Sequence, residues 1–487
     1  MNKLVSTSLF ILMLCACGTS KTLKLYSETP HDSGGKGAVR YKIALEIKGE
    51  KNKEALLVMH YGTKKYSIDT AKIDQWGKAV FTGNKPLTPG MYLIASDGNT
   101  MFDFLISDTI NQTFSVSTTK NKYAETLSFK NSPENEAFAD YTRFMLERQK
   151  KEKELNDKIK KEGKEKNYNS DTEAQIEALA EQTSLKIREI EVKYPGSLLS
   201  AMANAMNPVQ PKMSEMSKIP DNDKQRYLYE FLKTHYWDNI SLTDFRMQYT
   251  PILIPAVDNY FNSVLPQIPD SIMRGVDVVL NKAANDTLMT RMLAGHIFEN
   301  YIESKIMGME SVVVYIIDNY YLNGKVKIND AKFIGDITDY AYKNRETLVG
   351  KKAKNLKMET INGTYESLYD IDSPYTLVYI YEPTCGYCQQ ETPKVYKVFQ
   401  NYKNKGLVGF CVYSQSNREE WISYVSKNKL TDWINVWDPA NKNNFRIAYS
   451  VYSVPQVYLL DKDKKIIGRR LDSNSLSQML AHLIKDK

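Results

Sequence analysis

The pattern of hydrophobic and polar positions divides the chain into a segment with a sheet-like period, a helical segment and a segment that mixes both. From residue 41 apolar and polar residues alternate, with Tyr41, Ile43, Leu45 and Ile47 on one face. This period of two is typical of a half-buried strand. Similar short runs follow between turn sequences, at residues 56–61, 65–68, 79–81, 91–95, 101–106 and 113–116. Residues 40–118 are therefore predicted to form a small antiparallel β-sandwich.

The period becomes helical in residues 130–345. Met289, Leu293, Ile297 and Tyr301 recur every four residues, which predicts a buried stripe on one helix. Residues 147–166 instead hold nine basic and six acidic residues in twenty and have almost no apolar face. Such a segment is typical of a solvated helical arm or hairpin with i,i+4 ion pairs, and a partner-binding arm is the alternative. We expect an all-α domain with a charged arm.

Residues 350–487 alternate strand and helix patterns. The predicted strands are 375–381, 408–413, 456–460 and 465–471. The predicted helices are one that follows the first strand after a turn and ends at about residue 404, and two at 419–428 and 475–484. Alternation of this kind predicts an α/β sheet with flanking helices. The expected fold class is therefore multidomain, with a β-sandwich, an all-α domain and an α/β domain in that order.

Composition and charge exclude several classes of protein. The chain has 487 residues, of which 42% are hydrophobic and 25% charged. These values exclude a wholly disordered chain, a collagen and a polytopic membrane protein. The net charge of +7 is small beside 65 basic and 58 acidic residues. Because no basic stripe is interleaved with stacking aromatic residues, we predict no nucleic-acid partner.

The first residues have the pattern of a secretory signal. Lys3 precedes an apolar run at 4–14 and then Cys15-Ala16-Cys17. The run is shorter than the ~20 apolar residues that span a bilayer. Ala16-Cys17 resembles the bacterial lipobox, and this resemblance places a lipid on Cys17, with Cys15 as the alternative and an ordinary signal peptide also open. Residues 1–17 are therefore predicted to be a lipoprotein signal.

The residues after this signal predict where the protein is held. Residues 18–39 contain a Gly- and Ser-rich stretch and are predicted to be a flexible tether. No acidic residue follows Cys17 directly. We therefore expect a lipid-anchored protein of the cell envelope that faces the periplasm, on the outer rather than the inner membrane.

The candidate chemistry lies in Cys385-Gly386-Tyr387-Cys388, where a predicted buried strand ends and a helix begins. The free amides and the dipole of a helix N-terminus favour a thiolate, and the two-residue gap places both cysteines on one turn. A zinc site needs four ligands, and no second pair of this kind or nearby histidine pair is present. A structural disulfide across two residues would give little loop-closure stabilisation. Dithiol exchange by Cys385 and Cys388 is therefore favoured over both alternatives, with no metal and no cofactor.

Further residues give this motif a family resemblance. The order strand, CxxC, helix, and later Val454-Pro455 before a strand, resembles the thioredoxin fold, and especially the membrane-tethered thiol-disulfide oxidoreductases of the TlpA/ResA kind. Pro393, eight residues after Cys385, matches the proline that kinks the helix in this family. The resemblance implies that Pro455 is cis and, with Val454, binds the backbone of the substrate. It also implies a proton-transfer role for Glu391, which matches the glutamate of the CxxCxxE segment.

The order of the three predicted bodies extends this resemblance over the whole chain. It resembles thioredoxin-like lipoproteins of Bacteroidota that carry a β-sandwich and a helical domain of unknown function. The chain departs from thioredoxins at Thr384, where tryptophan is usual, and at Tyr379, where the buried aspartate is usual. Because the Gly-Tyr pair between the cysteines matches neither common dipeptide, the redox direction stays open. Cys411 lies on a predicted core strand and is expected to be a buried free thiol, with a third redox partner as the alternative.

These observations predict an enzyme, a thiol-disulfide oxidoreductase. Cys385 is expected to be the nucleophile and Cys388 the resolving thiol, and the two form a redox-active disulfide. The expected partners are disulfides or dithiols of other proteins and an upstream electron donor. The alternative is a redox-inactive periplasmic binding or scaffold lipoprotein whose working parts are the upstream domains.

Overall fold

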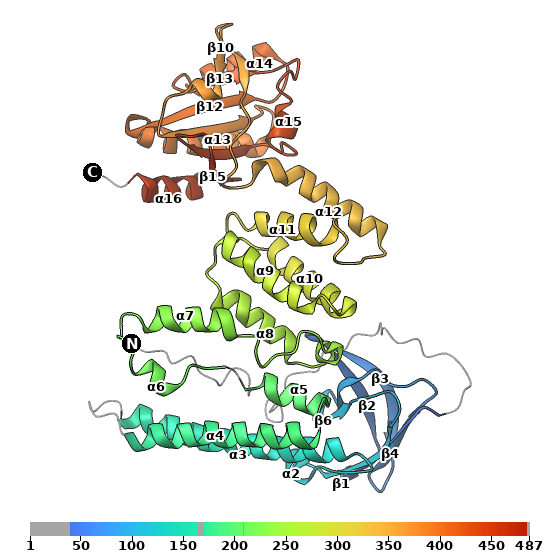
Figure 1. Cartoon of the computed structure of the whole chain (residues 1–487). Helices are drawn as coiled ribbons and strands as arrows, with labels where there is room; N and C mark the ends of the chain where they lie inside the picture. The colour runs from blue at the N-terminus through green and yellow to red at the C-terminus, as the bar shows by residue number, and fades with distance from the viewer. Residues whose placement is uncertain (1–38, 163–169, 208, 485–487) are drawn as a thin grey trace. The chain divides into compact units, whose positions relative to one another are not determined.

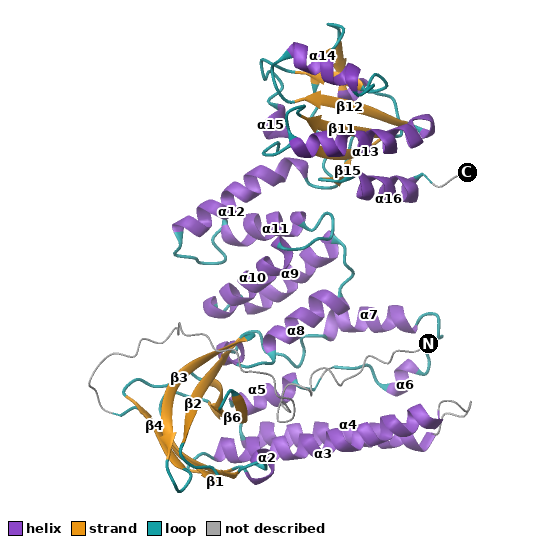
Figure 2. Cartoon of the chain, turned by 180° about the vertical axis from the view of Figure 1, so that it is seen from behind, coloured by secondary structure: helices purple, strands orange, loops and turns teal. Residues whose placement is uncertain are grey.

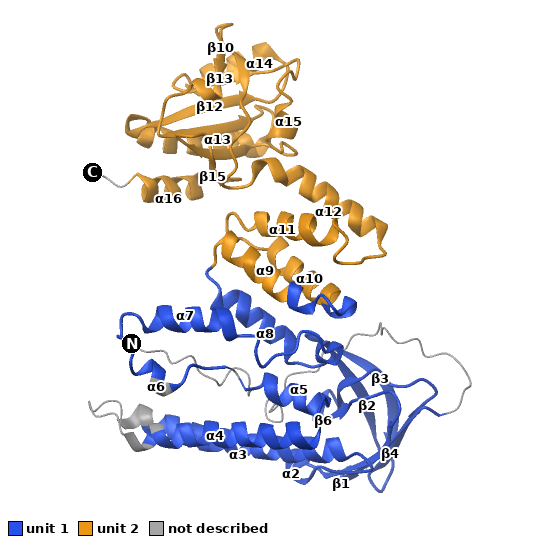
Figure 3. Cartoon of the chain, in the orientation of Figure 1, with its two compact units in different colours: residues 1–266, 281–289 blue, residues 267–280, 290–487 orange. Residues whose placement is uncertain are grey.

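The computed structural model describes residues 39–162, 170–207 and 209–484 (Figure 1). The predicted signal, the lipidation site Cys17 and almost all of the predicted tether lie outside the described residues. The chain divides into two compact units, residues 1–266 with 281–289 and residues 267–280 with 290–487 (Figure 3). A β-sheet domain, a helical middle region and a C-terminal α/β domain follow one another along the chain (Figure 2). The multidomain fold class is therefore confirmed.

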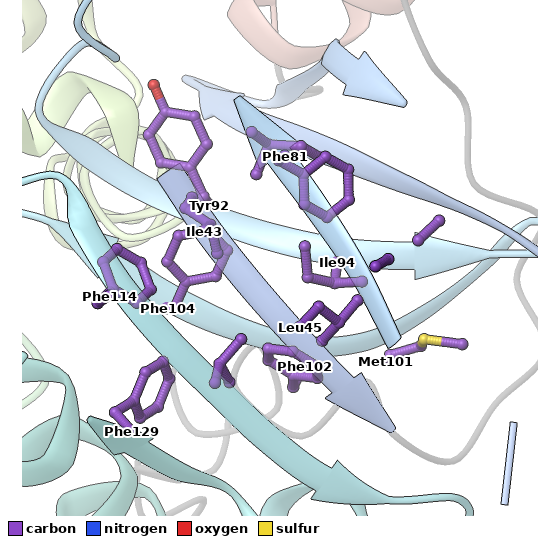
Figure 4. Close-up of a cluster of buried hydrophobic side chains, with 14 of the residues drawn as sticks. Ile43, Leu45, Phe81, Tyr92, Ile94, Met101, Phe102, Phe104, Phe114 and Phe129 are labelled. Atoms are coloured by element: carbon purple, nitrogen blue, oxygen red, sulfur yellow. The ribbon is translucent and has the colours of Figure 1, made fainter. Parts of the chain in front are cut away.

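The first unit begins with a β-sandwich. Its strands are β1 Tyr41–Lys48, β2 Lys53–Tyr61, β3 Lys64–Ile73, β4 Lys78–Gly83, β5 Gly90–Ser96, β6 Asn99–Ile106, β7 Thr113–Thr119 and β8 Ser128–Lys130. Within the described residues they form two four-stranded sheets with the orders β4-β1-β7-β8 and β3-β2-β5-β6. Side chains of both sheets share one core, which includes Ile43, Phe81, Tyr92, Phe104 and Phe114 (Figure 4). The sandwich is not purely antiparallel as predicted, because β1 and β7 pair in parallel.

His60 lies deeper than the sequence suggests. We expect a lone histidine on a strand of this kind to be at the surface or half-buried, but His60 is only 5% exposed. The expectation is wrong because β5, the neighbour of β2, is buried at every position. The segment Phe245–Tyr249 packs against both β2 and β5 and covers a face of the sheet that the sequence predicts to be exposed. His60 Nε2 lies 3.5 Å from the carboxylate of Asp103 on β6.

The middle region is helical throughout. Its elements are α2 Tyr123–Thr126, α3 Pro133–Glu162, α4 Ser170–Lys193, α5 Leu198–Ala205, α6 Met213–Met216, α7 Lys224–His235, η1 Phe245–Tyr249, α8 Leu253–Asn259, η2 Tyr260–Val264, α9 Pro269–Ala283, α10 Thr287–Ile302, α11 Glu310–Ile316, η3 Ile317–Tyr321, α12 Ala331–Asn344 and η4 Arg345–Thr347. The charged segment lies largely on α3, which packs against α4 as a helical hairpin. The predicted stripe on α10 is buried at all four positions. No helix among the described residues combines the length and apolar character needed to cross a membrane.

The α/β domain lies within the second unit. Its elements are β9 Lys357–Thr360, β10 Tyr365–Ser367, η5 Leu368–Asp370, β11 Tyr375–Tyr381, α13 Gly386–Tyr402, η6 Lys403–Lys405, β12 Leu407–Tyr413, α14 Arg418–Lys427, β13 Ile434–Trp437, α15 Phe445–Ala448, β14 Gln456–Asp461, β15 Ile466–Arg469 and α16 Ser473–Leu483. The sheet has the order β10-β9-β13-β12-β11-β14-β15. The strands β11, β12 and β13 are parallel, and β14 is antiparallel to β11. The strand β11 lies inside the sheet and is buried on both faces. Because α13 follows shortly after the carboxyl end of β11, the start of this helix is anchored to the core of the domain.

Candidate active site

Cys385 forms the junction between β11 and α13. It is the N-cap residue of the helix, and its Sγ accepts a hydrogen bond from the backbone N–H of Cys388 at 3.3 Å. An N–H group at this position, together with the helix dipole, stabilises negative charge on the sulfur. The Cys385 side chain is partly exposed, whereas Cys388 is 0% exposed. The two sulfurs therefore differ in access, with Cys385 open to a partner and Cys388 enclosed.

The loop before β14 faces Cys385. The Val454–Pro455 peptide bond is cis, and the Val454 carbonyl oxygen lies 3.5 Å from Cys385 Sγ. Val454 and Pro455 are half-buried, so part of their backbone is accessible beside the sulfur. The structure thus brings together four of the residues that the sequence singles out, from two segments about 70 residues apart.

The buried sulfur of Cys388 resists ionisation. Burial raises the pKa of Cys388 to about 12, and contact with Cys385 and the negative charge of Glu382 act in the same direction. A hydrogen bond from the Glu382 backbone opposes them. Because thiolates and not thiols attack disulfides, Cys388 needs a group that removes its proton before it can react.

Glu382 is the acidic residue whose charge acts on Cys388, and the sequence analysis missed it. Its carboxylate accepts hydrogen bonds from Thr384 Oγ1 at 2.6 Å and from Gln415 Nε2 at 2.7 Å. These hydrogen bonds, from Thr384 first, lower the pKa of Glu382 and so favour its ionised form. Its position three residues before Cys385 was the available signal, because it lies in the short turn between the end of β11 and the cysteine.

Glu391 lies on the same helix as the cysteines but has other partners. Its Oε1 accepts a hydrogen bond from the backbone N–H of Ser473 at 2.6 Å, and its Oε2 lies 3.3 Å from Lys394 Nζ. Burial opposes ionisation of Glu391, but the hydrogen bonds from Ser473 and Lys394 outweigh burial and lower its pKa. These contacts tie α13 to the start of α16, and the described residues show no hydrogen bond between Glu391 and either cysteine of the motif.

Two buried hydroxyl groups join β11 to α13. Tyr379, at the position where thioredoxins have an aspartate, shares a hydrogen bond of 2.8 Å with Thr392 of α13. Burial raises the pKa of Tyr379 far above its usual value, so its phenol stays neutral. Cys411 pairs with Tyr379 in the sheet register and is a fully buried free thiol.

The arrangement suits thiol chemistry. One partly exposed sulfur lies at a helix N-terminus and accepts a hydrogen bond from a backbone N–H group, a second, enclosed sulfur lies one turn away, and the half-buried segment Val454–Pro455 flanks the first. In the parts of the chain that the structure describes, no three His, Cys, Asp or Glu side chains gather as a metal site.

Three segments of the chain match known protein families. Residues 349–469 match the AhpC/TSA family. Residues 41–138 and 161–344 match two domains of unknown function, DUF4369 and DUF5106.

Individual relatives are similar to part of the chain. The thiol-disulfide oxidoreductase ResA of Bacillus cereus is 23% identical over 137 residues, which are 28% of this chain and 78% of that protein. A domain of a possible thiol-disulfide isomerase from Cytophaga hutchinsonii is 38% identical and covers 28% of this chain and 92% of its own, with a TM-score of 0.27. A thioredoxin-like protein from Bacteroides caccae is 17% identical and covers 56% of this chain and 97% of its own, with a TM-score of 0.42. Residues 349–469 are therefore an AhpC/TSA-family, thioredoxin-like domain of the thiol-disulfide oxidoreductase type, preceded by two domains of unknown function.

Proposed function

We propose that the protein is a membrane-tethered, extracytoplasmic thiol-disulfide oxidoreductase that exchanges the Cys385 and Cys388 dithiol with disulfides of partner proteins. The observation that carries this proposal is the difference between the two sulfurs. Cys385 is partly exposed and receives a helix N–H group, whereas Cys388 is enclosed and protonated. A nucleophile and a resolving thiol need this difference in access and ionisation.

The exchange runs in two steps. The Cys385 thiolate attacks one sulfur of the partner disulfide, and the S–S bond of the partner breaks and releases a thiolate that takes up a proton. Cys388 then loses its proton and attacks Cys385 Sγ, which breaks the mixed disulfide and releases the second partner thiol. The partner gains two electrons, and the enzyme is left with a Cys385–Cys388 disulfide. An upstream dithiol donor restores the reduced form, and the same steps in reverse oxidise a partner.

The backbone beside Val454 and Pro455 is the proposed binding segment for the substrate chain. Its position at 3.5 Å from Cys385 Sγ supports this role. An extended segment of the partner would align there and present its disulfide to Cys385.

An acidic residue is the proposed proton acceptor for Cys388. The sequence motif favours Glu391, and the contacts of Cys388 favour Glu382, whose ionised carboxylate acts on the pKa of that thiol. Glu391 is occupied by Ser473 and Lys394.

The proposal also includes a lipid anchor and a location in the cell envelope. A lipid on Cys17 would hold the enzyme on the periplasmic side of a cell-envelope membrane, which is an oxidising compartment where disulfide substrates occur. Metabolic labelling with a radioactive fatty acid should label the wild type and fail to label Cys17→Ser. Labelling of both proteins would contradict lipidation at this residue.

Reduction of insulin by the purified chain, with dithiothreitol as the electron donor, tests the catalytic part. Cys385→Ser should lose the activity, and Cys411→Ser should keep it because Cys411 is buried and has no role in the exchange. Equal activity of Cys385→Ser and wild type would contradict the proposal and favour a binding or scaffold protein.

A further inference from the structure

The C-terminal end of α12 contacts the loop that leads to Val454. Ser450 Oγ donates a hydrogen bond to the Lys343 carbonyl oxygen and lies 3.2 Å from Thr347 Oγ1. Lys343 Nζ lies 4.8 Å from the centre of the Tyr452 ring. A cation over an aromatic face is an attractive contact. The helix that ends the middle region thus holds the residues two and four positions before Val454.

The same helix end contacts a second segment of the α/β domain. Asn344 Oδ1 accepts hydrogen bonds from Arg469 at 2.8 Å and from Arg470 at 3.0 Å. Arg469 is only 3% exposed, and within the described residues its Nε and Nη1 have no hydrogen-bond partner. Because a buried guanidinium is costly unless acceptors compensate it, Asn344 is important for the position of this segment.

Both contacted segments have a backbone conformation that needs support. Ser450 has φ +49° and Arg470 has φ +50°, in the left-handed region that non-glycine residues rarely adopt. Such conformations persist where surrounding contacts fix them. At both places the contacts come from Lys343, Asn344 and Thr347.

The two segments lead to two different contacts with the CxxC helix and its N-cap residue. Ser450 and Tyr452 lead to Val454, whose carbonyl oxygen faces Cys385. Arg470 leads to Ser473, whose backbone N–H group holds Glu391 of α13. The end of α12 therefore supports both segments that flank the helix with the cysteines.

We propose that Lys343, Asn344 and Thr347 are positioning residues of the redox site. Lys343 and Thr347 hold the segment that leads to Val454–Pro455, Asn344 holds the segment that leads to Ser473, and both segments support the site that binds a partner chain. This inference rests on the function proposed above. Residues 161–344 and 349–469 match different families, so these residues lie at a domain boundary and outside the matched redox domain. The helical region would thereby affect how strongly a partner binds without touching the reacting sulfurs.

The experiment compares Asn344→Ala with Asn344→Asp in the full chain, with insulin as substrate. The alanine variant removes the acceptor for both arginines and should raise KM about fivefold to tenfold, the net effect of losing a typical hydrogen bond, with kcat within about twofold. The aspartate variant keeps an oxygen acceptor and should restore a KM close to that of the wild type. Circular dichroism and thermal melting check that each variant is folded.

A second pair isolates the contact with Tyr452. Lys343→Met removes the cation above the ring and should raise KM, whereas Asp339→Asn removes only the ion pair of Lys343, whose Nζ lies 2.5 Å from Asp339 Oδ2. Asp339→Asn should keep the KM of the wild type. Equal effects of the two variants would contradict a role for the Tyr452 contact.

Two further measurements separate this inference from the proposed function. The rate at which iodoacetamide alkylates Cys385 should be the same in Asn344→Ala and wild type, because that small reagent needs no binding segment. Hydrogen exchange of the amides at 470–473 should be faster in Asn344→Ala and unchanged in Asn344→Asp. If wild type fails to reduce insulin, the proposed function fails and the exchange data still decide the positioning role. Unchanged KM and unchanged exchange in Asn344→Ala would overturn the inference.

Discussion

The β-sandwich and the α/β domain each have a potentially reactive side chain on or next to a strand, but the two side chains differ in exposure. His60 is enclosed between strands and lies 3.5 Å from Asp103. Cys385 lies at the end of a strand, where the chain turns into a helix and leaves the sulfur partly exposed beside backbone donors. His60 lies within an interior strand, next to its last residue, and the neighbouring segments cover it, whereas Cys385 lies beyond the end of its strand and stays partly exposed. This difference predicts that His60 affects stability and Cys385 affects chemistry.

The largest effect should come from Cys388→Ala. With no resolving thiol, the mixed disulfide on Cys385 persists, and we expect its release to slow by at least about a thousandfold. Non-reducing electrophoresis with mass spectrometry of the captured partner measures this. The double variant Cys385→Ala with Cys388→Ala should capture nothing. Capture through Cys388 in a Cys385→Ala variant would reverse the assignment of the two thiols.

His60→Ala should destabilise the sandwich and leave exchange unchanged. The substitution leaves a cavity beside Asp103, and we expect a loss of about 2 kcal/mol in the free energy of unfolding. Urea unfolding measures the loss, and insulin reduction measures the activity. The exposed His482 is the matched control, and His482→Ala should change stability by less than about 0.5 kcal/mol. A drop in exchange activity with His60→Ala in the folded protein would break the comparison.

Glu382→Gln should slow the resolving step by about tenfold or more, because a positioned base accelerates proton transfer by at least that factor. The measurement is the decay of a preformed mixed disulfide between pH 6 and 9. If Glu382 acts only through its charge, its removal should lower the pKa of Cys388 and speed the decay, so the sign of the change decides between the roles. Glu391→Gln is the parallel test, and a larger slowing there would return the proton-transfer role to Glu391.

The smallest effect concerns Cys411. Burial raises the pKa of Cys411 well above its ordinary value of 9.0, so the folded thiol keeps its proton while the unfolded thiol ionises. The folded state then binds more protons above about pH 9, and stability falls as pH rises, by at most about 1.4 kcal/mol per pH unit for this group. Cys411→Ala should make the loss of stability between pH 9 and 10.5 less steep, by urea unfolding. An unchanged slope would mean that Cys411 ionises in the folded protein.

Part of the fold and of the site could be predicted from local signals. The strand Tyr375–Tyr381 is found with the predicted bounds, because six of its seven residues are apolar or aromatic and give a strong signal. The strand Ile434–Trp437 was missed, since four residues between loops give almost no periodicity. The parallel pairing of β1 with β7 was also missed, because it joins segments about 70 residues apart.

Sequence alone singled out the residues of the proposed chemistry. Two cysteines at a strand-to-helix junction and a later proline are local features, because spacing along one helical turn fixes which side chains are neighbours. Tertiary structure decided the rest: the depth of Cys388, the charge of Glu382 near it, and the contacts of Asn344 with Arg469 and Arg470. Burial and charge depend on which distant segments pack together, and no single segment records that packing.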